Sequence, residues 1–173
     1  FFVDQSLYQP FTAAFVARAS QVVTGNGMMA GVEMGPVANH RRIEAMEALV
    51  EDAVAKGAKL LTGGQRPKGP GYFYPVTVLA EVPDDARIMR EEPFGPLAVI
   101  NPTASLDQAI AMANALPFGL AGYAFTHRAA TVDRLMAELE VGNLSINTLE
   151  ASVPEVPFGG VKHSGQGREG GQE

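Results

Sequence analysis

The sequence predicts an α/β fold in which a mostly parallel sheet carries helices on its faces. Three observations lead to this prediction. Segments with helical periodicity alternate with short apolar runs of strand length. From Leu97 onward the order is strand, helix, strand, helix, strand, with short links. Parallel strands need crossover connections of this length, and a helix usually supplies them.

The first two helices are expected in the amino-terminal third of the chain. One spans residues 10–23, with Pro10 suited to its first turn. The other spans residues 41–56, where apolar side chains recur every three or four positions, and Gly57 ends it.

Two more helices are expected after Leu97. Residues 104–116 form the first of them, and Ser105 and Gln108 at its start fit a capping box. Residues 132–139 mark the second, which stops at Gly142.

Short apolar runs between the helices have the composition of buried strands. They cover residues 1–3, 58–61, 72–82 with an interruption at Pro75, 97–100, 122–126 and 143–147. In such sheets a ligand binds beyond the carboxyl ends of the strands. We therefore expect Pro102, His127 and Thr148 near any site.

The composition of the chain argues against several classes of function and partner. The chain has 173 residues, a net charge of −6 and 46% apolar residues, which fits one globular domain with its own core. The negative charge argues against a nucleic-acid partner, which requires a basic face. Cysteine is absent, so these residues hold no disulfide, thiolate metal site or cysteine nucleophile. No apolar run approaches the ~20 residues of a membrane span, and we expect a cytoplasmic protein without a membrane partner.

Neither a dinucleotide fingerprint nor a metal site is predicted. Residues 165–170 match G-x-G-x-x-G, but only three residues follow, too few for the helix that this fingerprint requires. We interpret the segment as a Gly-rich loop. The three histidines, His40, His127 and His163, share no metal-ligand spacing.

Two segments carry residue types that suit a binding site. In residues 91–96 (EEPFGP), two carboxylates precede a turn that prolines stiffen. A carboxylate held there could accept hydrogen bonds from a ribose diol beside the flat ring of Phe94. The alternative is a surface turn with solvated glutamates. In residues 157–169, glycines allow close backbone approach beside Phe158, a candidate pocket wall, and the alternative is a flexible tail.

Together and in this order, with Asn147 between them, the two segments resemble the aldehyde dehydrogenase superfamily. Supporting matches are residues 34–36 (MGP), 58–64 (AKLLTGG), 118–122 (FGLAG) and 141–147 (VGNLSIN). The similarity covers essentially the whole chain. It implies an incomplete three-layer α/β/α catalytic domain, whose parent uses NAD or NADP to oxidise an aldehyde and forms a homodimer or homotetramer.

The resemblance implies residue roles where the motifs match. It maps the ribose-binding glutamate onto Glu92, the phenylalanine beside the nicotinamide onto Phe94, and the aromatic wall of the substrate tunnel onto Phe158. The family's nucleophilic cysteine, general-base glutamate, oxyanion-binding asparagine and dinucleotide-binding domain belong upstream of Phe1. We therefore assign no catalytic residue to this chain.

Both ends look cut, because the chain starts with Phe and its last nine residues contain four glycines and no hydrophobe. The resemblance then implies a catalytic domain that begins shortly after the cysteine, ends before the last oligomerisation strand and is inactive alone. The rival hypothesis is a stand-alone, non-catalytic module of the same fold that binds a protein partner.

The loop of residues 148–156 bears on the substrate. Its length and Ser152 resemble the succinate-semialdehyde group of the family, in which a serine here helps to hold the substrate carboxylate. Glu150 and Glu155 would repel an anionic substrate if they faced the tunnel. Succinate semialdehyde and a general aldehyde both stay open as substrates.

Overall fold

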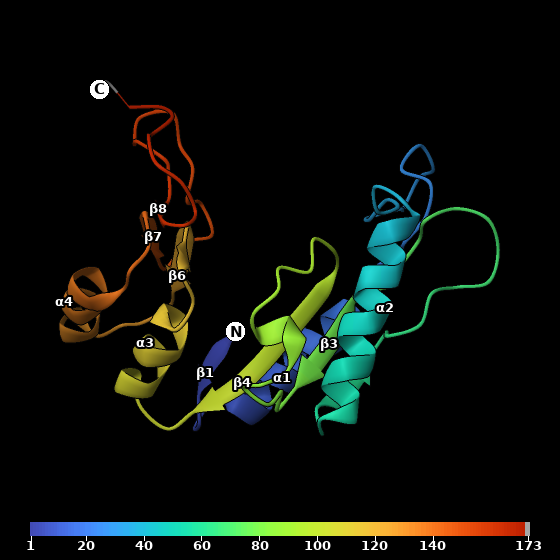
Figure 1. Ribbon diagram of the computed structural model, residues 1–173, viewed down its shortest axis with the longest axis horizontal. Helices are drawn as coiled ribbons and strands as arrows, with labels where there is room; N and C mark the ends of the chain where they lie inside the picture. The colour runs from blue at the N-terminus through green and yellow to red at the C-terminus, as the bar shows by residue number, and fades with distance from the viewer. Residues whose placement is uncertain (172–173) are drawn as a thin grey trace. The chain divides into compact units, whose positions relative to one another are not determined.

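The computed structural model describes residues 1–171, and the chain divides into two compact units, Phe1–Ala104 and Ser105–Glu173 (Figure 1). The first unit is built on a four-stranded sheet in the order β1-β4-β3-β2. Its strands are β1 (Phe2–Asp4), β2 (Lys59–Thr62), β3 (Thr77–Ala80) and β4 (Leu97–Thr103). β4 pairs in parallel with β1 and β3, and β2 joins β3 antiparallel.

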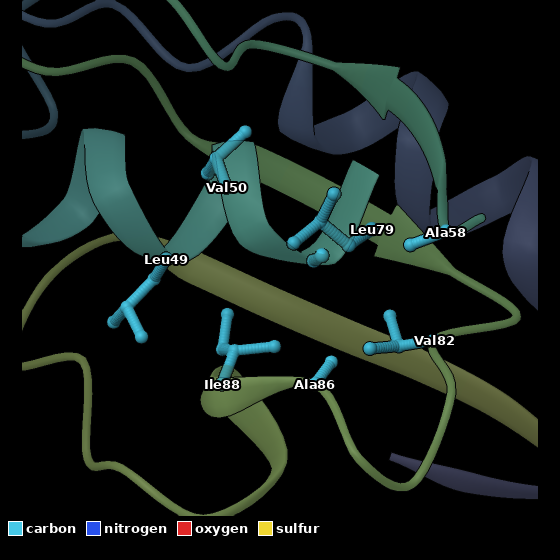
Figure 2. Close-up of a cluster of buried hydrophobic side chains, with 8 residues drawn as sticks. Leu49, Val50, Ala58, Leu79, Val82, Ala86 and Ile88 are labelled. Carbon is cyan, nitrogen blue, oxygen red and sulfur yellow. The ribbon is translucent and has the colours of Figure 1, made fainter. Parts of the chain in front are cut away.

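Helices cover both faces of this sheet, which gives the expected three layers. Successive side chains on a strand point to opposite faces. On β3, Val78 packs toward α1 (Tyr8–Ala19), and Leu79 packs toward α2 (His40–Ala55) and the short 3-10 helix η1 (Arg87–Met89). Figure 2 shows the α2 side, where buried side chains from these elements point toward one another. Each large apolar side chain buried there stabilises the fold by about 1.5–3 kcal/mol.

The predicted helices of the first unit form, with shifted ends. The predicted apolar stripe has six residues, and α2 buries five of them, Ile43, Met46, Leu49, Val50 and Ala53; the sixth, Val54, is 43% exposed. Asn39 caps its first turn by accepting a hydrogen bond from the Arg42 N–H, and Gly57, at φ 105°, follows its end. α1 ends at Ala19, short of residue 23.

In the second unit, the strands of the described residues 105–171 form two separate pairs. β6 (Ala121–Ala124) and β7 (Asn143–Ile146) are parallel, and α4 (Ala129–Glu138) is their crossover. β5 (Phe118–Gly119) and β8 (Val161–Lys162), which were not predicted, pair antiparallel. The strands from Leu97 onward therefore do not share one sheet, because β4 pairs within the first unit.

α3 (Leu106–Asn114) starts as predicted, with the Ser105 hydroxyl accepting a hydrogen bond from the Gln108 N–H at 3.1 Å. α4 ends at Glu138, ahead of Gly142, because the residue after it is already extended. Within the described residues, no helix combines the length and apolarity that crossing a bilayer requires.

The strand predicted over residues 72–82 is wrong for its first half. Only Thr77–Ala80 forms a strand. Pro75 has no N–H to donate to a ladder, and Tyr74 instead enters a separate buried cluster with Ile43 and Met46 of α2.

Candidate functional site

The turn between η1 and β4 holds Glu92 and Phe94, the first pair of predicted site residues. Both side chains are exposed, Phe94 to 67%. Glu92 makes no hydrogen bond or ion pair with any residue that the structure describes. Phe94 has a φ of 43°, a left-handed conformation that costs a non-glycine residue roughly 1–2 kcal/mol. The turn thus presents a free carboxylate and a strained, exposed ring.

Contacts with the core hold this turn in place. A Cβ on Gly95 would lie 2.1 Å from the sulfur of Met46, which is fully buried on α2, so a larger residue could not pack this closely. The Pro96 carbonyl accepts a hydrogen bond from the Thr77 N–H at 2.8 Å, which ties the turn to β3. The residues after Phe94 therefore fix its position against two elements of the core.

The adjacent carboxylates Glu91 and Glu92 have different environments. Glu91 accepts hydrogen bonds from Nε and Nη2 of Arg87 at 2.8 and 2.9 Å. These bonds lower the pKa of Glu91 and raise the pKa of Arg87. The Arg87 N–H also donates to Asp52 of α2 at 2.8 Å. Glu91 therefore helps to hold the turn against α2, and Glu92 is left available to a ligand.

The second unit holds the other predicted pair, Ser152 and Phe158, in the long segment after β7. Ser152 is exposed, and its hydroxyl has no hydrogen-bond partner among residues 1–171. Phe158 is half-buried. Its N–H donates to the Glu169 carbonyl at 2.7 Å, and its carbonyl accepts from the Glu169 N–H at 2.8 Å. Residues 157–169 therefore form a closed loop and not the flexible tail that was the alternative.

His127 and Thr148 follow the carboxyl ends of β6 and β7, as the sequence predicted. Asn147 joins these ends: its Oδ1 accepts from the Thr126 N–H at 2.8 Å, and its Nδ2 donates to the Thr126 carbonyl at 2.9 Å. Pro102 lies inside β4 of the first unit and not beyond its end. The carboxyl ends of β6 and β7 are thus joined by the Asn147 side chain as well as by the hydrogen bonds of the ladder.

The four predicted residues line neither of two surface hollows. A cavity of about 600 Å³ in the first unit lies between the loops around Thr24 and residues 65–71. A groove of about 280 Å³ in the second unit lies between α4 and β7. Among the described residues, no cluster of His or acidic side chains could hold a metal ion. Glu92, Phe94 and Ser152 are instead exposed on the surface of their units, and Phe158 is half-buried.

Sequence reasoning missed Asn143, the first residue of β7. Its side chain bonds the backbone on both sides of Phe158, through the Pro157 carbonyl and the Gly159 N–H. The signal was a polar residue between Gly142 and an apolar strand. Asn143 lies in the predicted strand of residues 143–147 and in the matching segment of residues 141–147, and neither pattern indicates a role beside Phe158.

Comparison with known proteins extends the motif matches to the whole chain. The family model described as the aldehyde dehydrogenase family matches residues 1–173. A putative 4-(hydroxymethyl)benzenesulfonate dehydrogenase of Comamonas testosteroni is 50% identical over 173 residues, which are 100% of this chain and 36% of that protein. A succinate-semialdehyde dehydrogenase of Paenarthrobacter nicotinovorans is 41% identical over 173 residues, which are 100% of this chain and 38% of that protein.

The fold has close neighbours among solved structures. The crystal structure of succinate-semialdehyde dehydrogenase from Burkholderia pseudomallei superimposes with a TM-score of 0.95 and 40% identity. The match covers 98% of this chain and 35% of that one. The chain thus spans about a third of the length of the relatives that it matches.

Proposed function

Because the chain belongs to the aldehyde dehydrogenase family, we propose that it is part of an NAD(P)-dependent enzyme that oxidises an aldehyde to the carboxylic acid. The observation that carries this proposal is the turn of residues 91–96. There Glu92, a carboxylate with no hydrogen-bond or ion-pair partner among residues 1–171, precedes the exposed and left-handed Phe94. Strained backbone that the surrounding structure enforces occurs preferentially at functional sites.

A nicotinamide dinucleotide fits the chemistry of this turn. The two carboxylate oxygens of Glu92 can accept hydrogen bonds from both hydroxyls of a ribose. The ring of Phe94 offers a flat apolar contact for the nicotinamide. When bound, the cofactor accepts the hydride that leaves the substrate. NAD and NADP share this ribose, so the turn does not choose between them.

For the substrate, we propose an aldehyde that carries a carboxylate, with succinate semialdehyde as the first candidate. The exposed hydroxyl of Ser152, which has no hydrogen-bond partner in the described part of the chain, supports it, as do the names of two relatives. Phe158 would supply the apolar wall. A general aldehyde is the second candidate, because Glu150 and Glu155 are also exposed and would disfavour an anion. The parent enzyme is proposed to be a cytoplasmic homodimer or homotetramer.

The proposal is tested by comparing the 173-residue chain with the product of the longest reading frame that contains it. The longer product should form NAD(P)H from succinate semialdehyde. The 173-residue chain should show no turnover, because it has no cysteine to attack the aldehyde. Turnover by the short chain would contradict the assignment. A longer product that oxidises no aldehyde would favour the stand-alone binding module.

In the longer enzyme, Ser152→Ala should raise the KM for succinate semialdehyde about fivefold, since one hydrogen bond contributes about 1 kcal/mol. The KM for an uncharged aldehyde of similar length, such as butanal, should stay the same, because it has no carboxylate to lose. Steady-state kinetics with both aldehydes measure the difference. Equal changes for both would remove Ser152 from the substrate site.

A further inference from the structure

The carboxamide of Asn143 brackets Phe158. Its Nδ2 donates to the Pro157 carbonyl at 3.0 Å, and its Oδ1 accepts from the Gly159 N–H at 3.0 Å. Phe158 itself is bonded through its N–H and carbonyl to Glu169. The backbone is therefore fixed before, at and after Phe158, and the bonds on either side of it come from one side chain.

Gly142 makes this arrangement sterically feasible. A Cβ at this position would lie 1.7 Å from the Gly159 carbonyl oxygen, so the loop approaches β7 as closely as backbone allows. Asn143 then meets one donor and one acceptor, and the two ends of its carboxamide match both. Aspartate could still accept from the Gly159 N–H, but it would set a second acceptor against the Pro157 carbonyl.

We propose that Asn143 is a positioning residue that sets where the Phe158 ring stands in the substrate site, and thereby the selectivity among aldehydes of different width. This inference rests on the proposed function of the chain. A phenylalanine side chain has only two torsions, so the place of its ring follows closely from its backbone. Releasing Pro157 and Gly159 would let the ring move and would relax discrimination between a slim and a bulky aldehyde.

The second unit offers a matched control in Asn114. Its Nδ2 donates to the Glu138 carbonyl at 2.7 Å, and its Oδ1 accepts from the Glu140 N–H at 2.9 Å. Asn114→Ala thus removes the same kind of two-bond clamp from the same unit, but not from the backbone that flanks Phe158. A purely structural role of Asn143 predicts similar effects for the two alanine variants.

The first arm of the test uses the 173-residue chain and amide hydrogen exchange. Asn143→Ala should speed exchange of the Gly159 amide about tenfold, whereas Asn114→Ala should speed exchange at Glu140 and leave Gly159 unchanged. Asn143→Asp keeps the acceptor and loses the donor, so it should speed exchange at Gly159 less than alanine does. Unchanged exchange at Gly159 in Asn143→Ala would overturn the clamp.

The second arm uses the longer enzyme with butanal and benzaldehyde. Asn143→Ala should change the ratio of the two kcat/KM values by about fivefold or more, while Asn114→Ala leaves that ratio unchanged. If Asn143→Ala and Asn114→Ala are active and have the same ratio of kcat/KM values, the inference about Asn143 is overturned and the proposed function is not affected. A wild-type enzyme that oxidises neither these aldehydes nor succinate semialdehyde would overturn the proposed function, and with it the selectivity that Asn143 is proposed to set.

Discussion

Gly142→Ala is expected to lower the free energy of unfolding of the second unit by about 3 kcal/mol. The new Cβ would lie 1.7 Å from the Gly159 carbonyl oxygen and 2.7 Å from its carbonyl carbon. Both are backbone atoms, so no rotamer change can relieve the clash. The loop carrying Phe158 would have to separate from β7. Chemical denaturation followed by circular dichroism measures the loss.

Gly35→Ala is the matched control for this experiment. A Cβ at Gly35 meets none of the described residues within 4 Å, and Gly35 is exposed and its φ lies outside the left-handed region. Its substitution should change the free energy of unfolding by no more than about 0.5 kcal/mol. Equal unfolding curves for the two variants would contradict the close packing of the loop on β7.

In the longer enzyme, Glu92→Gln should raise the KM for the nicotinamide cofactor about tenfold or more, since hydrogen bonds to charged groups contribute about 1.5–3 kcal/mol. Glutamine replaces one acceptor oxygen by a donor and removes the charge, so it cannot accept from both ribose hydroxyls as the carboxylate can. The KM for the aldehyde should change much less. Steady-state kinetics with NAD and with NADP give both values.

Glu91→Gln is the control, because Glu91 is the residue next to Glu92 and makes the same chemical change possible in a different environment. It weakens an ion pair with Arg87 in which both side chains are about half exposed, at 52% and 47%. Such pairs contribute about 1 kcal/mol or less to stability. The cofactor KM should therefore stay close to that of the wild type. A larger effect of Glu91→Gln than of Glu92→Gln would exchange the roles of the two carboxylates.

The parts of the fold that local sequence determines were predictable. Periodicity predicted the buried stripe of α2, Gly57 predicted its end, and Ser105 predicted the cap of α3. The pairing of the strands in the sheet was harder to predict, because the paired residues are far apart in the sequence. Phe2 pairs with Asn101 across the chain, and no local pattern specifies that partner.

The candidate site divides in the same way. The motif of residues 91–96 identified Glu92 and Phe94. It did not show how the environment of Glu92 differs from that of Glu91. That difference depends on the hydrogen bonds from Arg87, whose i, i+4 spacing to Glu91 was the available signal. The left-handed φ of Phe94 occurs in a turn whose next two residues contact α2 and β3, and no local pattern in the sequence indicates it.

A crystal structure of the longer enzyme with its nicotinamide dinucleotide bound would show whether the turn of residues 91–96 contacts the cofactor, as proposed. We predict Glu92 carboxylate oxygens within about 3.2 Å of both hydroxyls of the nicotinamide ribose, with the Phe94 ring against the nicotinamide. A bound cofactor that touches neither Glu92 nor Phe94 would contradict the claim.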